Sequence, residues 1–314
     1  MSWRYSLYTE TMFVDTHSHL NFKVFRSQLS AVLERARKVG VEQVVVVGSQ
    51  LKNSQRAVEQ TQAYEAIFAA VGVHPHHVWD YLEKAKSQAK IAGQSLETVM
   101  NEVMELVSAE LKNLVRQPKV VAVGEIGLDY HQFEQTQYDD KMITPEYQLW
   151  QERFFLLQAK IASDANKAII IHNREAADDM LNLLTKHAYL FQNKQVVFHC
   201  CEAEPRLLAH AVEHHYFIGV DGDVTFDQVK QTFIKQVPLE NLVLETDSPY
   251  ITPEPDKSFF TEHKAELSYK DRVCEPRHVA VIAEKAAELK KVSIEEVSMQ
   301  TTKNAHQLFS LDEV

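Results

Sequence analysis

The chain has 314 residues, a net charge of −11 and three cysteines, two of which are adjacent at Cys200 and Cys201. It holds no run of about 18 apolar residues that would cross a membrane, residues 1–10 lack the pattern of a secretory signal, and so few cysteines argue against a disulfide framework. We therefore expect a cytoplasmic protein, and the net acidity argues against wrapping of nucleic acid by cationic side chains.

Short apolar runs rich in β-branched residues alternate with amphipathic stretches along the chain, which is the pattern of repeated βα units. The predicted strands are Thr11–Thr16, Gln43–Gly48, Ile67–Gly72, Lys119–Gly124, Ala168–His172, Gln195–His199, Tyr216–Val220 and Leu242–Thr246. Predicted helices between them include Phe25–Val39, Ser54–Tyr64, Glu146–Ala165, Glu175–His187 and Glu204–His214. Eight such units predict a single α/β domain over residues 1–314, folded as a (β/α)8 TIM barrel. A doubly wound open sheet is the second interpretation, although no G-x-G-x-x-G motif follows the first strand.

Two segments interrupt the βα rhythm. An insertion at about residues 80–118 separates the third and fourth predicted strands, and its Ser95–Arg116 part has apolar residues at helical spacing, with Ser95 as a candidate N-cap. We interpret this part as an extended helix of the outer ring, with a lid or an oligomer contact as the alternative. Pro253–Cys274 is a second long loop, which follows the last strand and is therefore expected near the active-site face.

Histidines and carboxylates recur where the predicted strands end. His17 and His19 follow the first strand, and alternate residues of an extended segment point to the same side, so both imidazoles can face one ion. Four further residues lie at or just beyond the carboxyl ends of other predicted strands, the end at which barrel enzymes place their catalytic groups. These residues are Glu125, His172, His199 and Asp247.

Four histidines and two carboxylates suit a divalent cation such as Zn, Mn, Mg or Ni. Six ligands are too many for one ion with an open position, and two ions bridged by Glu125 would use them better. Such a pair activates a water and clamps the oxygens of a phosphoryl displacement. Asp247 is the candidate general base, and Glu245, two residues earlier, is a candidate partner of a metal ligand.

At these residues the chain resembles the TatD-type metal-dependent deoxyribonucleases, a branch of the amidohydrolase-like TIM barrels. The resemblance covers nearly the whole chain, and it is specific through the combination of its motifs. The motifs are Phe13–Leu20 (FVDTHSHL), Val71–His76 (VGVHPH), Val123–Tyr130 (VGEIGLDY), Ile170–Arg174 (IIHNR), Phe198–Cys200 (FHC) and Leu244–Tyr250 (LETDSPY).

The resemblance implies hydrolysis of DNA phosphodiesters, often as an exonuclease. It assigns one metal position to His17, His19, Glu125 and Asp247, and the other to Glu125, His172 and His199. It also implies that Asp247 activates the attacking water and that His74 contacts a phosphate.

Arg174 and Arg272 are the cationic candidates for phosphate contacts, because a guanidinium pairs with phosphate oxygens in a fixed geometry. Two departures from the family pattern concern the substrate. Acidic residues follow His199 where a small neutral turn is usual, in the segment Cys201–Pro205, and Cys274 precedes Glu275-Pro276 where the family often carries Asn. A role of the cysteines as thiolate ligands is a minor alternative to their burial as small apolar residues.

Two other functions compete with a nuclease. The same barrel and metal site would support an amide, ester or lactone hydrolase acting on a small molecule. Many such enzymes bridge their metals with a carboxylated lysine, whereas the fourth strand here supplies Glu125. A non-catalytic scaffold is the third possibility, and the intact set of six ligands argues against it. The sequence leaves the metal, the polarity of cleavage and the oligomeric state open.

Overall fold

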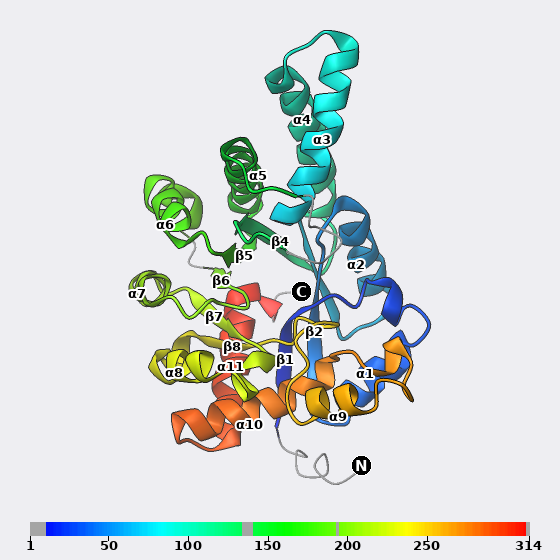
Figure 1. Cartoon of the computed structure of the whole chain (residues 1–314). Coiled ribbons are helices and arrows are strands. Elements are labelled where there is room, and N and C mark those ends of the chain that lie inside the picture. Colours follow the sequence, from blue (N-terminus) through cyan, green and yellow to red (C-terminus); the bar gives the residue numbers. More distant parts are fainter. Residues whose placement is uncertain (1–10, 134–140, 193–194, 312–314) are drawn as a thin grey trace.

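The computed structural model describes residues 11–133, 141–192 and 195–311. Over these residues, eight parallel strands form one sheet, and each strand pairs with its neighbours in the sequence. The helices lie outside the ring of strands (Figure 1). The strands are β1 (Phe13–Ser18), β2 (Val41–Val47), β3 (Ile67–Val71), β4 (Val120–Asp129), β5 (Ala168–Arg174), β6 (Val196–Phe198), β7 (Phe217–Val220) and β8 (Leu242–Leu244).

The α-helices alternate with the strands over most of the chain. No helix in the described part is both long and apolar enough to cross a membrane. The helices are α1 (Leu29–Arg37), α2 (Leu51–Ala63), α3 (Pro75–Ala92), α4 (Leu96–Leu114), α5 (Pro145–Asp164), α6 (Ala177–Lys186), α7 (Pro205–His214), α8 (Gln228–Gln236), α9 (Asp256–Glu262), α10 (Val279–Lys290) and α11 (Ile294–Phe309).

The sheet closes where the first strand meets the segment after the last. The amide of Asp247 donates to the carbonyl of His17 (2.9 Å), and the amide of His19 donates to the carbonyl of Ser248 (2.7 Å). Below these bonds, the carboxylate of Asp15 accepts from the hydroxyl of Thr246 (2.7 Å) and from its amide (3.1 Å). These bonds join β1 to β8, so the prediction of a closed barrel is confirmed and the open doubly wound sheet is excluded.

Side chains alternate between the two faces of the strands. In β2, Val45 and Val47 pack inside the barrel, while Val44 and Val46 pack against the helices. The C-terminal part of α11 contributes Leu308 to the cluster inside the barrel. The hydroxyls of Ser298 and Thr302, earlier in α11, donate to the carbonyl of Met12, just before β1. The end of the barrel where the strands begin is therefore covered, and the carboxyl end of the strands is left to hold a site.

All eight predicted strands exist, with ends that differ by a few residues. Three strands continue further than predicted: β1 runs to Ser18, β4 to Asp129 and β5 to Arg174. A prediction from the apolar pattern alone ends each strand at the point where polar residues begin. In this barrel those polar residues remain in the strand, so His17 and Glu125 are held by the sheet itself.

The insertion between β3 and β4 is a pair of helices. The helix predicted from Ser95 is present as α4, and the hydroxyl of Ser95 caps it by accepting from the amide of Thr98 (3.0 Å). The preceding helix α3 was not predicted, although its signals are standard: Pro75 at the first position and Gly93 in the left-handed conformation (φ 66°) at its end. The two helices rise together away from the rest of the barrel (Figure 1), and α4 also packs against α2 and α5.

The prediction of Pro253–Cys274 as a long loop missed two short helical elements. This segment contains α9 and a single 3-10 turn, Tyr269–Asp271. Seven residues of helix are too few to show a period of 3.6 in the sequence, which is why the pattern missed α9.

Replacing Thr246 with Val tests the join between β1 and β8. The buried carboxylate of Asp15 would lose its closest donor, so the free energy of unfolding should fall by about 1–3 kcal/mol. Urea unfolding followed by circular dichroism measures the change. The matched control is Thr232→Val on the exposed side of α8, which removes a hydroxyl bonded only within its own helix. Equal losses in the two variants would contradict the role of this bond.

Candidate metal centre

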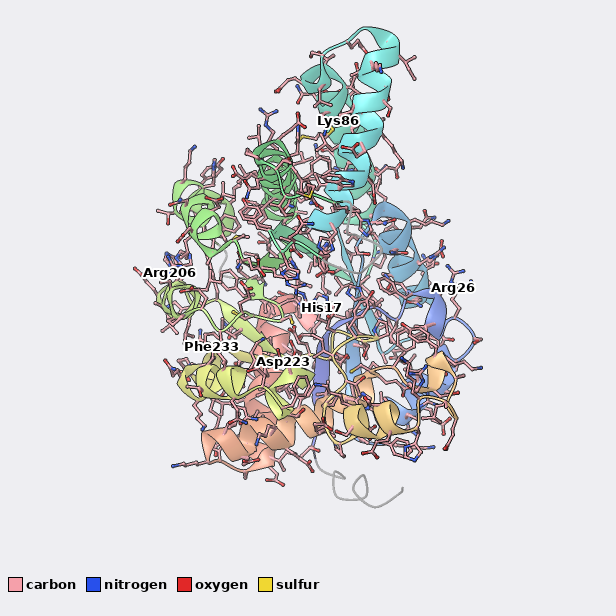
Figure 2. The ribbon with its side chains drawn as sticks, in the orientation of Figure 1. His17, Arg26, Lys86, Arg206, Asp223 and Phe233 are labelled. Carbon is pink, nitrogen blue, oxygen red and sulfur yellow. The ribbon has the colours of Figure 1, made fainter. Side chains whose placement is uncertain are left out.

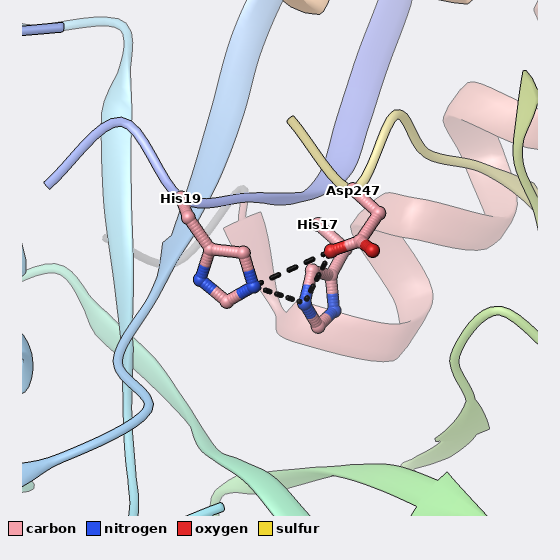
Figure 3. A group of neighbouring side chains, drawn as sticks. All are labelled: His17, His19 and Asp247. Carbon is pink, nitrogen blue, oxygen red and sulfur yellow. Dashed lines mark hydrogen bonds and ion pairs between the residues drawn. The ribbon is translucent and has the colours of Figure 1, made fainter. Parts of the chain in front are cut away.

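His17, His19 and Asp247 meet at the join between β1 and β8. The Nε2 atoms of the two imidazoles are 3.4 Å apart, and Oδ1 of Asp247 lies 3.7 Å from Nε2 of His17 and 3.3 Å from Nε2 of His19. Figure 3 shows the three groups pointing at one another. Asp247 has a left-handed backbone (φ 48°), which turns the chain sharply after β8. Together these atoms form one three-ligand group.

Glu125 of β4 connects this group to a second one. Its Oε1 lies 3.4 Å from Nε2 of His19, while its Oε2 lies 3.1 Å from Nε2 of His199 and 3.7 Å from Nδ1 of His172. Oε2 also lies 3.8 Å from Nε2 of His17, so the carboxylate faces imidazoles of both groups, as a bridging ligand requires. The structure brings all six predicted ligands together at the carboxyl end of the strands, and Figure 2 places His17 near the middle of the barrel.

The outer nitrogens of two imidazoles are held by acceptors, and that of a third faces a carboxylate. Nδ1 of His19 donates to the carbonyl of Val47 (2.9 Å), and Nε2 of His172 donates to Oδ2 of Asp129 (2.9 Å). Nδ1 of His199 lies 3.5 Å from Glu245, the carboxylate that the sequence marked as a ligand partner. A carbonyl or carboxylate can only accept, so the outer nitrogen keeps its proton and the inner nitrogen is the one that binds a cation after losing any proton it carries.

The charges of the centre also fit a cation. Burial lowers the pKa of His19, but its hydrogen bonds to Asp247 and Glu125 outweigh burial and raise the pKa to about 10. Burial and the neighbouring His199 lower the pKa of His17. Burial raises the pKa of Glu125, yet the surrounding imidazoles, His74 and His19 first, bring it well below its usual range. Asp247 and Glu125 thus stabilise a proton on the inner nitrogen of His19. A divalent ion can replace that proton.

The predicted substrate contacts have different places. His74 is buried beside Glu125, and its Nδ1 accepts from the amide of His76 (3.0 Å), so its Nε2 carries a proton that it can donate. Arg174 lines the cleft with its guanidinium over the ring of Phe133 (5.1 Å). Arg272 is not among the described residues that line the cleft, and its Nε donates to the carbonyl of Leu267 instead (3.2 Å).

A cleft of about 740 Å³ opens over the centre. Several of the residues that line it were not singled out from the sequence. They come from loops and helices that are far apart in the chain. The only signal in the sequence that could have indicated them as cleft residues is that their segments follow predicted strands. They are Phe22, Lys23, Gln50, Asn53, Arg56, His77, Phe133, Tyr250 and Tyr269.

The cysteines do not reach the centre as ligands. Burial raises the pKa of Cys200 and brings that of Cys201 to about 12, so both stay protonated. In the described residues, the groups of side chains that could hold a metal contain no cysteine. Cys274 is buried beside His278, with Sγ 3.4 Å from Nδ1. These thiols are therefore packing residues, as the sequence favoured.

Comparison with known proteins gives a consistent result. The family model described as TatD related DNase matches residues 14–310. The uncharacterized metal-dependent hydrolase YabD of Bacillus subtilis is 31% identical over 303 residues, covering 96% of this chain and 100% of that protein. The 3'-5' ssDNA/RNA exonuclease TatD of Edwardsiella piscicida is 29% identical over 293 residues, covering 91% and 95%. The crystal structure of YJJV, a TatD homolog from Escherichia coli, shares the fold with a TM-score of 0.72 at 24% identity, covering 95% and 98%.

Asp129→Ala should weaken metal binding without removing a ligand. The variant frees the ring of His172, and loss of such a partner typically costs about 10- to 100-fold in metal affinity. Asp129→Asn keeps an oxygen that can accept, so it should lose less. Competition with a fluorescent chelator measures both affinities. If Asp129→Ala binds Zn²⁺ as tightly as the wild type, the account of this contact is incorrect.

Metal binding at neutral pH should release about one proton at the first group, because His19 is protonated in the metal-free protein and must lose that proton to become a ligand. The raised pKa means that affinity falls as the pH is lowered, by about tenfold per pH unit for one proton. Calorimetric titration in buffers of different ionisation enthalpy measures the release. An enthalpy that is independent of buffer would contradict it.

Proposed function

Because the chain belongs to the TatD related DNase family, we propose that it is a divalent-metal-dependent hydrolase that cleaves phosphodiester bonds of DNA as an exonuclease. The observation that carries the proposal is the convergence of four histidines and two carboxylates on one point beneath an open cleft. Relatives named as deoxyribonucleases and as an exonuclease support the substrate.

We assign the first metal position to His17, His19, Glu125 and Asp247. The second position consists of Glu125, His172 and His199. Nearest distances of 3.1–3.8 Å among these atoms leave space for a cation at each position. Imidazole and carboxylate ligands fit Zn, Mn, Mg or Ni, and the distances do not select among these.

Bound divalent ions supply charge that stabilises the phosphoryl transition state and lowers the pKa of a water molecule. The side chain of Asp247 is 14% exposed, against 6% for Glu125, so Asp247 is the carboxylate that a water in the cleft can reach. We assign it as the general base, which takes the proton while the water oxygen bonds to phosphorus and one P–O ester bond breaks.

His74 and Arg174 hold the phosphodiester in this proposal. Burial lowers the pKa of His74, so its imidazole is neutral and donates through Nε2 to a phosphate oxygen. Arg174 supplies a charged donor at the rim of the same cleft. Arg272 has weaker support as a phosphate contact, because its Nε donates to the loop that carries it and it is not among the described residues that line the cleft.

The other assignments rest on weaker support. We retain one domain over residues 1–314, because all eight strands belong to one sheet. We propose a cytoplasmic location, because three free cysteines suit a reducing compartment. A small-molecule amide, ester or lactone hydrolase is the alternative function, and it is disfavoured because a glutamate takes the bridging place on β4.

Asp247→Asn tests this function. Removing the base and a charged ligand should lower the rate of DNA cleavage by about 10²–10⁴-fold. The assay is a time course on 5′-labelled and 3′-labelled single-stranded DNA with Mg, Mn, Zn or Ni, and the ladder gives the polarity. Asp164→Asn, on the exposed face of α5, is the control and should cleave normally. Absence of metal-dependent products from the wild type, with turnover of a lactone or ester, would replace the nuclease with the alternative.

A further inference from the structure

Two aromatic rings stand beside the first three-ligand group. Phe22 stacks on His19, with ring centroids 4.7 Å apart and planes at 15°. The ring of Tyr250 lies 6.2 Å from that of Phe22, at 78° to it, and is 52% exposed. The backbone of Tyr250 is fixed by a hydrogen bond from its amide to the carbonyl of Asp247 (2.9 Å). The exposed ring therefore stands next to the place where the phosphodiester would be cleaved.

Two cations line the same side of the cleft. Lys23 follows Phe22 directly, and Arg56 lies on α2, where it donates to Asn53 (3.3 Å). No carboxylate in the described part of the chain lies within 4.0 Å of either cation, whereas Arg35, Arg153 and Arg206 each have one. In a chain with a net charge of −11, such cations beside the centre are available to a phosphate.

Two carboxylates lie close together on the far side of the barrel, outside the residues that line the cleft. Glu175 follows β5 and Glu202 follows β6, and these strands lie opposite β1 and β2 in the ring. The carboxylate of Glu202 accepts from the amide of Glu175 (3.0 Å) and from the side chain of Asn173 (3.2 Å), which holds it beside Glu175. Glu175 is also paired with His131. These two carboxylates make this side less favourable for a polyanion than the side that carries Lys23 and Arg56.

We propose that Phe22, Tyr250, Lys23 and Arg56 form a subsite for single-stranded DNA. The two aromatic rings stack on the unpaired base next to the phosphodiester that is cleaved, and the two cations bind the phosphates of the DNA backbone that follow it. This inference rests on the proposed function. An aromatic face accepts any base, and the two cations meet phosphates, which is how single strands are held without sequence preference. The strand then leaves the cleft over β1, β2 and β8, on the side of the two cations and away from Glu175 and Glu202.

The test combines Tyr250→Ala with substrates that lack one base. Oligonucleotides carrying a single abasic residue at successive positions from the cleaved end are compared by kcat/KM in both proteins. In the wild type, one abasic position should lower kcat/KM by about tenfold, the usual effect of losing one stacked base. In Tyr250→Ala the intact strand should already show that loss, and the same abasic position should add nothing. Tyr250→Phe keeps the ring and should behave as the wild type does.

The control is Tyr189→Ala, which removes another exposed tyrosine (59%), located after α6 and away from the cleft. It should retain the full abasic effect. If the abasic residue costs the same in Tyr250→Ala as in the wild type, the base does not stack there and the subsite is refuted. Failure of the nuclease itself is a separate outcome, because then no oligonucleotide is cleaved by any of these proteins.

Binding gives a second readout that does not need cleavage. Fluorescence anisotropy with a labelled oligonucleotide, in metal-loaded protein carrying Asp247→Asn, measures affinity at several salt concentrations. Adding Arg56→Ala should reduce the slope of log affinity against log salt by about 0.7, the value for one phosphate contact on a single strand. Adding Arg116→Ala, an exposed change before β4 at the opposite end of the barrel, should leave the slope unchanged. Equal slopes in the two variants would show that Arg56 does not meet the strand.

Discussion

The hydrogen bonds that join β1 to β8 determine where the chemistry of this protein can occur. They bring His17 and His19, near the start of the chain, against Asp247, more than two hundred residues later. Asp15 lies beneath them, fully buried, and burial raises the pKa of its carboxyl. Since a closed barrel has no free strand edge, the positions of these groups are fixed by the backbone. The first three-ligand group is therefore a consequence of closing the sheet.

The second group consists of Glu125, His172 and His199. It depends on the position of Glu125 in the middle of the barrel and on acceptors that bind the outer nitrogens of the imidazoles. Glu125 reaches across to face the imidazoles of both groups, so that one carboxylate serves two positions. Asp129 and the carbonyl of Val47 each orient one imidazole, which leaves its inner nitrogen to bind a cation. Without a metal ion this arrangement lowers the stability of the fold, because polar and charged side chains are buried away from solvent. A divalent ion at each position relieves that cost, and the fold and the metal should therefore stabilise each other.

Much of this arrangement follows from the sequence, because strands are buried on both faces and polar residues at their ends stand out. The eight strands and the closed barrel were obtained in this way, the family resemblance came from the sequence motifs, and the six candidate ligands lie together. The orienting role of Asp129 could not be obtained, since it depends on which ring nitrogen of His172 faces inward. The cleft walls were missed as well, because neither the predicted helix that contains Arg56 nor the motif that ends at Tyr250 indicates which of its residues face the cleft. The two segments line one cleft only in the folded chain. Arg272 was selected for its residue type and its place after a strand, and the bond from its Nε to its own loop appears only in the structure.

Anomalous X-ray diffraction from crystals grown with Mn²⁺ or Zn²⁺ tests the central claim most directly. The account predicts two anomalous peaks about 3.5–4 Å apart, one among His17, His19 and Asp247 and the other between His172 and His199, with Glu125 bridging them. One peak confined to a single group would require a one-metal mechanism. Peaks located away from these side chains would contradict the account as a whole.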